Sequence, residues 1–274
     1  MSSAAARRRI PLILGGAVIG ILFSVALLSL VWTPVSPTKI QILAKLKPPL
    51  AQGLLGTDHF GRDVASMLMA GAWNSLSTSV VAVAIGASTG TLLGVVAAAQ
   101  RGWLEAAIMR LCDIVFALPP ILSAMMLGAF IGSGRFTAII AIGTFMVPVF
   151  ARLTCGAARQ MWARDFVLAA ESIGRSKAGI TLSHVLPNIA HLIIVQISIQ
   201  LGLAILTEAG LSFLGLGMPP PTPTWGRMLW ESQTYLATAP WLAILPGLAI
   251  ALTVLGFNLL GDGLRDLLDP RLRR

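Results

Sequence analysis

The chain has 274 residues, of which 56% are hydrophobic and only 11% are charged, and its mean hydropathy is +0.83. Soluble domains carry about 25% charged residues, so this composition excludes an ordinary soluble protein and indicates a polytopic membrane protein. The formal net charge of +9 does not indicate nucleic-acid binding, because the basic residues are scattered between apolar segments instead of forming one face.

Six segments are long and apolar enough to cross a bilayer, which takes about 20 residues of helix. We therefore predict an all-α integral membrane protein with six transmembrane helices. The first segment is longer than the roughly 7–15-residue core of a signal peptide, so we expect an uncleaved span with its N terminus in the cytoplasm. The predicted spans are residues 10–32, 73–99, 105–130, 136–151, 191–215 and 241–260.

Two spans carry features that affect packing. In the second span, Gly86, Gly90 and Gly94 are spaced four apart, which puts small residues on one helix face and predicts a closely packed neighbouring helix. The third span contains Pro119-Pro120, which should bend or interrupt it.

Residues 33–72 form the first predicted external segment, which contains the stretch LGTDHFGRD. Asp58 and Asp63 are candidate caps of short helices, and Arg62 is placed to pair with either. We expect a structured loop packed over the mouth of a pathway in preference to direct substrate contact. Residues 1–72 then form an N-terminal unit, and residues 73–274 a five-helix core. The candidate residues of this external motif are Gly56, Thr57, Asp58, Gly61, Arg62 and Asp63.

The distribution of positive charge tests this topology. Of the 20 Lys and Arg residues, 14 fall on the predicted cytoplasmic side and 6 on the external side. Cytoplasmic loops of membrane proteins are enriched in Lys and Arg, and an assignment with five or seven spans would move one group of arginines outside. The charge asymmetry therefore supports six spans.

Catalytic and metal-binding motifs are absent from the sequence. There is no GxxxxGK[ST] loop for ATP phosphates, no HExxH and no GxSxG. The histidines, His59, His184 and His191, fall on different predicted sides, so they should not form one metal site, and Cys112 and Cys155 are expected to be buried or reduced thiols. We therefore expect neither an enzyme nor a cofactor bound by this chain.

Two carboxylates fall within the predicted spans, Asp113 in the third and Glu208 in the fifth. Isolated charges are costly in a bilayer, so such acids are candidates for function. Glu208 is a candidate proton carrier or pathway residue, but a structural role, with a hydrogen bond to a neighbouring helix or a protonated side chain, is favoured.

The segment between the fourth and fifth spans, residues 152–191, is polar and basic. Its centre reads FVLAAESIGRSKAGITLSHVLPN and predicts two short helical pieces. Asp165 is the candidate N-cap of the first piece, and Gly174 should end it. The second piece runs toward Pro187, and we expect Leu186 to be non-helical because it precedes a proline.

This segment resembles the E-A-A…G…I-x-L-P loop of binding-protein-dependent ABC-transporter permeases. Ala169-Ala170, Gly174 and Leu186-Pro187 match its spacing, whereas Leu168 replaces the glutamate and His184 the isoleucine. LGTDHFGRD, TEAGLSFLGLG at 207–217 and FNLLGDGLRDLLDPR at 257–271 are similar to the second, C-type permease of the dipeptide, oligopeptide and nickel group.

The resemblance implies a type I importer permease fold in the bacterial cytoplasmic membrane, with both termini in the cytoplasm. It also implies four partners besides lipid: a B-type permease, two ATPase subunits that bind ATP and Mg, and an external solute-binding protein; nucleic acid is not among them. The residues implied in ATPase coupling are Ala169, Ala170, Glu171, Gly174, Leu186, Pro187 and Asn188.

The cargo implied by the resemblance is a dipeptide or oligopeptide, and nickel or another small solute is the alternative. A transporter of a different class, driven by an ion gradient, is the other possibility. In that case Glu208 and Asp113 would be the ion-coupling groups.

Overall fold

The computed structural model describes residues 3–268, with side chains from Ile10 onward except Pro120. Within this range the chain is helical, as predicted, and its one β-type pairing is an isolated bridge between Thr57 and Asp63. The helices are α1 Ser3–Leu28, η1 Ile42–Ala44, α2 Val64–Gln100, α3 Gly102–Ala117, α4 Pro120–Ile131, α5 Arg135–Trp162, α6 Asp165–Ser172, α7 Lys177–Ile180, η2 Thr181–Val185, α8 Leu186–Phe213, α9 Trp225–Ser232, η3 Gln233–Tyr235 and α10 Trp241–Leu268.

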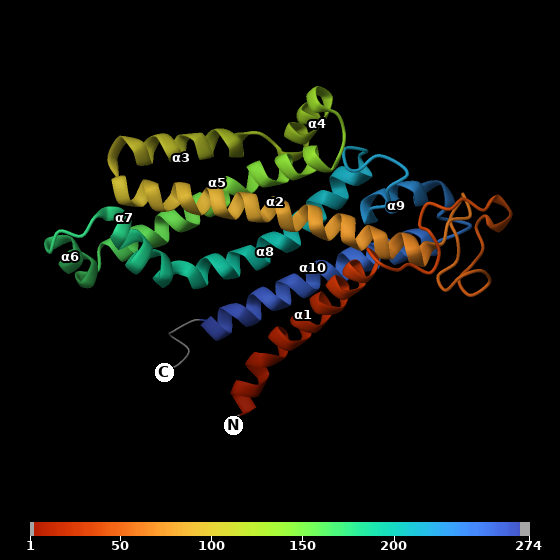
Figure 1. Cartoon of the computed structure of the whole chain (residues 1–274), viewed down its shortest axis with the longest axis horizontal. Coiled ribbons are helices and arrows are strands. Elements are labelled where there is room, and N and C mark those ends of the chain that lie inside the picture. Colours follow the sequence, from red (N-terminus) through yellow and green to blue (C-terminus); the bar gives the residue numbers. More distant parts are fainter. Residues whose placement is uncertain (1–2, 269–274) are drawn as a thin grey trace.

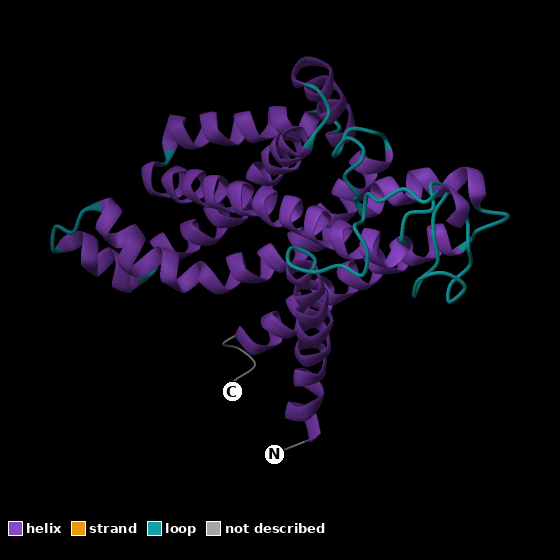
Figure 2. Cartoon of the chain, turned by 45° about the vertical axis from the view of Figure 1, so that its right-hand side comes forward, coloured by secondary structure: helices purple, strands orange, loops and turns teal. Residues whose placement is uncertain are grey.

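The long helices run along the length of the molecule, and α2 packs on α5, α8 and α1 (Figure 1). α1 and α10 form a pair on one side of the bundle, which Figure 2 shows extending away from it. One end of the molecule carries α6 and α7, and we call residues 163–185 the hairpin. The opposite end carries α9 and residues 33–63, and we call it the loop end. The first turn of α1 and the last turn of α10 both lie away from the loop end.

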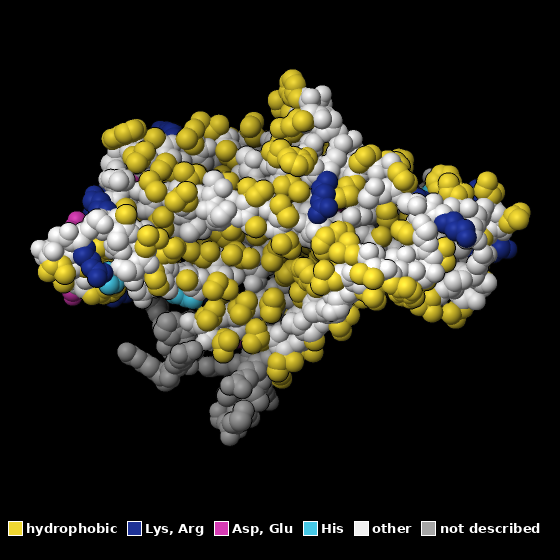
Figure 3. Space-filling view, in the orientation of Figure 1, with side chains coloured by type: hydrophobic (Ala, Val, Ile, Leu, Met, Phe, Trp, Pro, Cys, Tyr) yellow, Lys and Arg dark blue, Asp and Glu magenta, His cyan; other side chains and the backbone are white. Residues whose placement is uncertain are grey.

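Five helices are long and apolar enough to cross a membrane, and a sixth span results if α3 and α4 count as one. The two meet at an angle of 87°. Helix α3 ends at Ala117, and Leu118 is extended (φ −92°, ψ 124°), as the residue before a proline prefers. The predicted interruption at Pro119-Pro120 is thus confirmed. On the face in Figure 3, apolar side chains cover the middle, and most charged ones lie toward the two ends.

The helices extend beyond the predicted spans. Helix α2 begins at Val64 instead of Trp73, so the expected boundary between residues 72 and 73 lies inside it. Helix α5 continues to Trp162, so much of the segment predicted as a loop is helix, and α10 continues to Leu268. The spans were predicted from runs of apolar residues, and such runs identify only the part of a helix that lies in the hydrocarbon of the bilayer. Capping by Asp63 and ion pairs of α5 arginines stabilise the polar continuations.

Glycines set the distance between α2 and α5. A Cβ atom added to Gly90 would lie 2.5 Å from the Val147 carbonyl oxygen, and one added to Gly94 would lie 2.6 Å from that of Ala151. Gly86 meets α5 in the same way, so the predicted close helix contact is confirmed and its partner is α5. Gly15 and Gly263 make a similar contact between α1 and α10, which the sequence analysis did not predict.

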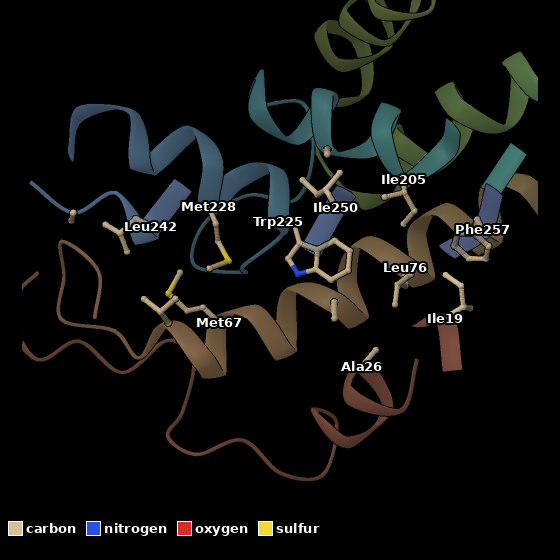
Figure 4. Packing of buried hydrophobic residues seen from close by; sticks show 14 residues of the cluster. Ile19, Ala26, Met67, Leu76, Ile205, Trp225, Met228, Leu242, Ile250 and Phe257 are labelled. Carbon is tan, nitrogen blue, oxygen red and sulfur yellow. The ribbon is translucent and has the colours of Figure 1, made fainter. Parts of the chain in front are cut away.

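Helix α9 closes the loop end of the bundle by inserting Trp225 between the long helices (Figure 4). Trp225 is almost fully buried, and its indole Nε1 donates to the Leu68 carbonyl at 3.1 Å. Gly71 provides room for the indole, because a Cβ there would lie 3.1 Å from its Cδ1 atom. On the other side of α9, Gly226 lies directly against the Ala209 carbonyl of α8. The short helix therefore connects α2 with α8.

We expect Gly90→Ala to destabilise the bundle, since overpacking a close contact costs about 1–3 kcal/mol. Gly156→Ala, on the open side of α5 where a Cβ meets nothing within 4 Å, should be neutral or stabilising by up to about 1 kcal/mol. The measurement is thermal unfolding in detergent with a thiol-reactive dye, because Cys112 and Cys155 are buried and unbridged in the folded chain. Equal melting temperatures for the two variants would contradict the assigned contact.

Candidate functional site

Helix α6, the first arm of the hairpin, begins one residue earlier than predicted. Arg164 occupies the N-cap position with an extended backbone (φ −85°, ψ 142°), and Asp165 is the first residue of α6. The prediction that Asp165 caps this helix is therefore wrong. Its carboxylate instead lies in the first turn, where a negative charge interacts favourably with the helix dipole.

Gly174 ends α6, as predicted. Its backbone is left-handed (φ +81°), and its N–H donates to the Glu171 carbonyl at 2.9 Å. The next N–H, of Arg175, donates to the Ala170 carbonyl at 3.2 Å. These two bonds form a Schellman motif, in which glycine is favoured because it adopts the left-handed conformation without steric cost. The motif reverses the chain direction within the hairpin.

The second arm of the hairpin is continuous with α8. Leu186 is helical (φ −59°, ψ −44°), so the prediction of a non-helical residue before Pro187 is wrong. The preceding residues form a π-helical turn, Thr181–Val185, in which the Leu186 N–H donates to the Thr181 carbonyl five residues back. This wider turn relieves the clash of the proline ring with the carbonyl four residues earlier. The result is one apolar helical stretch, Lys177–Phe213, of 37 residues.

The inner face of the hairpin packs on the ends of α5 and α8. Val167, Ile180 and Val185 are fully buried in a cluster that includes Trp162 and Ile189. Arg175 connects the turn with the second arm, because its Nη1 lies 3.2 Å from His184 Nε2 and 3.3 Å from Ser183 Oγ. The hairpin is therefore attached to both long helices.

The outer face of the hairpin exposes apolar side chains. Ile173 is 78% exposed, and Phe166, Leu168 and Leu182 are each about half exposed or more. Of the seven residues implied in ATPase coupling, Ala170 is buried and Leu186 is partly buried; the exposed ones are Ala169, Glu171, Gly174, Pro187 and Asn188. An exposed apolar surface rimmed by polar residues is typical of a protein interaction site.

The external motif folds on itself at the loop end. Asp58 Oδ1 accepts hydrogen bonds from the N–H groups of Phe60 (2.9 Å) and Arg62 (2.7 Å). Asp63 caps α2 by accepting from the Ser66 N–H at 2.8 Å, whereas Asp58 caps no helix. Gly61 is left-handed (φ +73°) and lies against the Gln41 carbonyl, where no side chain fits. The motif thus forms a compact loop at the start of α2.

Arg62 connects this loop with α9 through ion pairs. Its Nε donates to Asp58 Oδ2 at 2.6 Å and its Nη2 to Glu231 Oε2 at 2.5 Å. Only 7% of the Arg62 side chain is exposed. Arg227 also pairs with Glu231, at 3.0 Å. Of the two partners expected for Arg62 from the sequence, Asp58 is observed, and Glu231 was not foreseen.

His59 borders this network. Its ring stacks on Tyr235, with the ring centroids 5.2 Å apart, and its Nδ1 lies 3.9 Å from Asp58 Oδ2. Burial lowers the pKa of His59; Asp58 and Glu231 oppose this effect, and Arg62 and Lys45 add to it. Asp58, His59 and Glu231 hold possible ligand atoms within 4.8 Å of one another. Both carboxylates are engaged by Arg62, so the geometry is that of an ion-pair network.

The two acids predicted within spans differ in their surroundings. Glu208 is 2% exposed; it accepts a hydrogen bond from Ser212 at 2.6 Å, while its second oxygen has no protein partner within residues 3–268. The bond to Ser212 lies within α8. Asp113 has a side chain that is 52% exposed, and it pairs with Arg152 of α5. The structure does not bring the two acids together.

Residues 90–274 match the family described as binding-protein-dependent transport system inner membrane component. The chain belongs to this family. It is therefore a permease component of the inner membrane, and the matched region includes the hairpin but not the LGTDHFGRD loop.

Curated relatives match across most of the chain. A glutathione transport system permease protein GsiD from Escherichia coli O157:H7 is 48% identical over 225 residues, covering 82% of this chain and 74% of the relative. GsiD from Pectobacterium atrosepticum is 44% identical, with 82% and 75% covered. An inward-facing structure of the MetNI methionine ABC transporter has a TM-score of 0.60 at 17% identity, covering 70% of this chain and 91% of that chain. The fold is that of a type I importer permease.

The residues that sequence reasoning missed at the loop end are Glu231 and Arg227. Glu231 is 169 residues from Arg62, and Arg227 precedes Glu231 by four residues, so no local pattern connects either with the motif. Their own spacing of four is the usual pattern of an ion pair on a helix, and it was the available signal.

We expect Arg62→Ala to destabilise the chain by about 3–5 kcal/mol, because it leaves the buried Asp58 carboxylate without its cation and Glu231 with Arg227 alone. Lys39→Ala removes one exposed positive charge from the same loop and should have little effect. Thermal unfolding in detergent, together with limited proteolysis of residues 33–63, measures both changes. A melting temperature of Arg62→Ala equal to that of Lys39→Ala would show that the network does not hold the loop end.

We expect the stability of the chain to fall as the pH is lowered from 7 through about 6.5 toward the lower pKa of folded His59. Below about pH 6.5 the unfolded chain binds a proton that folded His59 resists, so protonation favours unfolding. His59→Phe keeps a ring against Tyr235 but cannot titrate. The fall in melting temperature caused by His59 should therefore be missing from its profile between pH 5 and 8. Parallel profiles for the two proteins would exclude His59 as the cause.

Proposed function

We propose that this chain is the C-type permease subunit of an importer for short peptides, in which the hairpin docks on a separate ATPase subunit. The observation that carries the proposal is the hairpin itself. It holds exposed apolar residues, Ile173 above all, on a turn whose first arm follows α5 and whose second arm continues into α8. Apolar side chains at this position are unsuited to water and suited to a protein cleft.

The attachment of the hairpin suggests how force reaches the spans. Helix α7 continues into α8 without a break, and only residues 163–164 separate α6 from α5. A hairpin held in a cleft therefore moves with both long helices when ATP closes the ATPase subunits on each other. Rocking of these helices would switch the pathway between inward-facing and outward-facing states.

The proposed orientation puts the hairpin and both termini in the cytoplasm and the loop end outside. It is supported by the excess of basic residues expected on that side, 14 of 20. The first turn of α1 and the last turn of α10 also lie away from the loop end, as two cytoplasmic termini require. In this orientation, Arg164, Arg175 and Lys177 are cytoplasmic.

The proposed complex contains a second, B-type permease, two ATPase subunits and an external solute-binding protein that delivers cargo at the loop end. ATP and Mg would bind in the ATPase subunits, because this sequence holds no phosphate-binding loop. This chain then supplies half of the pathway wall and no catalytic residue.

The proposed cargo is a short peptide. The curated relatives are named for glutathione transport, and glutathione is itself a tripeptide. The carboxylates near His59 are engaged by Arg62, which disfavours a nickel site, and Asp113 is paired with Arg152, which disfavours an ion-carrying role.

We expect Ile173→Glu to reduce capture of the ATPase subunits by about tenfold or more, because it puts a charge at the centre of an apolar contact. Leu43→Glu is the matched control; Leu43 is 99% exposed at the loop end, so the same chemical change lies away from the hairpin. The measurement is co-purification of the ATPase subunits from membranes in mild detergent. Equal capture by both variants, or no capture by the unaltered chain, would contradict the proposal.

A further inference from the structure

A large cavity lies at the hairpin end, between α5, α8 and α10. Its volume is about 650 Å³, and its walls come from the last turns of α5, the first half of α8 and the last turn of α10. This volume is within the usual range for ligand pockets, about 300–1,000 Å³. The exposed apolar residues that the hairpin offers for docking, such as Ile173, do not line this space, although Arg164 and Asn188 do.

The polar part of the cavity wall carries two guanidinium groups, those of Arg164 and Arg265, and no carboxylate from the part of the chain that the structure describes. The other polar residues of the wall are His191, Gln160, Asn188 and Gln196. Within residues 3–268, neither Arg164 nor Arg265 forms an ion pair or a side-chain hydrogen bond. Two guanidinium groups that face one space without a counter-charge favour an anion with several acceptor oxygens, such as a phosphate.

The wall changes from basic to apolar along the helices. Arg164 lies just beyond the end of α5, His191 lies near the start of α8, and Arg265 is in the last turn of α10, so all three are at the hairpin end. Leu192, Val195 and Ile199 follow along one face of α8, toward the middle of the span. A phosphate group at the basic end and a hydrocarbon chain along the apolar face would match this gradient.

We propose that this cavity binds an anionic phospholipid, with its phosphate between Arg164 and Arg265 and an acyl chain along Leu192, Val195 and Ile199. Basic pockets between transmembrane helices bind anionic lipid headgroups in this way. The lipid would connect α10 with the two helices that carry the hairpin. The proposal goes beyond the importer function and does not require the ATPase subunits.

The test uses the full chain, purified in detergent and titrated with dioctanoyl phosphatidylglycerol or dioctanoyl phosphatidylcholine. We expect the anionic lipid alone to raise the melting temperature. The double variant Arg164→Gln/Arg265→Gln should need roughly 25-fold more of it, since each basic residue beside an anionic lipid contributes a factor of about five. Arg164 caps α6 through its backbone and not its side chain, so glutamine is tolerated there.

The double variant Arg101→Gln/Arg110→Gln is the matched control, because it removes the same charge from exposed positions outside the cavity and outside the hairpin. It should keep the response of the unaltered chain. Leu192→Trp keeps every charge but fills the apolar wall, and it should also lose the response; it tests the site even if the arginine variant fails to fold.

Three results would overturn the proposal. One is an unchanged preference for phosphatidylglycerol in both cavity variants, and another is an equal loss in the control. The third is displacement of phosphatidylglycerol by glutathione at similar concentration, which would assign the cavity to the solute pathway. ATPase capture, measured on Ile173→Glu with all cavity residues intact, tests the proposed function separately, because a lipid response does not depend on it.

Discussion

The close contact between α2 and α5 is the constraint on which the rest of the bundle depends. Gly86, Gly90 and Gly94 bring the two backbones together where side chains would separate them. In hydrocarbon there is little hydrophobic force between helices, so such close packing is a main source of association. Helix α2 also contacts α1, α3, α8 and α9, and α5 carries the first arm of the hairpin. This contact therefore helps to set the position of the hairpin relative to the loop end, together with α8, which carries the second arm and contacts α9.

The two ends of the molecule are stabilised by different interactions. At the loop end, buried ion pairs of Arg62 join residues distant in sequence, and Trp225 fills the space between α2 and α8. Such a network holds one geometry, because separating its charges leaves them buried without partners. At the hairpin end, a Schellman motif and a π-helical turn shape the chain, and apolar residues remain exposed. A rigid loop end and an exposed hairpin suit a subunit that is driven from one side.

The hairpin and the neighbouring cavity share their supporting helices. Helices α5 and α8 carry the hairpin and also form two walls of the cavity, while α10 forms the third. Any group bound between Arg164 and Arg265 would therefore resist separation of α10 from the helices of the hairpin. Lipid occupancy and ATPase docking, as proposed here, would act on the same helices from different sides, although each can be measured alone.

The sequence by itself determined the helical class, the apolar centres of the spans, the break at Pro119-Pro120, the glycine face of α2 and the turn at Gly174. These depend on local apolar length, on proline and glycine geometry and on helical spacing, which are properties of neighbouring residues. Only the tertiary structure decided that α5 is the partner of the glycine face, that Leu186 stays helical before Pro187, and that Glu231 binds Arg62 across 169 residues. It also decided that Arg164, His191 and Arg265 share a cavity. Each of these depends on contacts between segments far apart in the chain, and no local pattern specifies which segments meet.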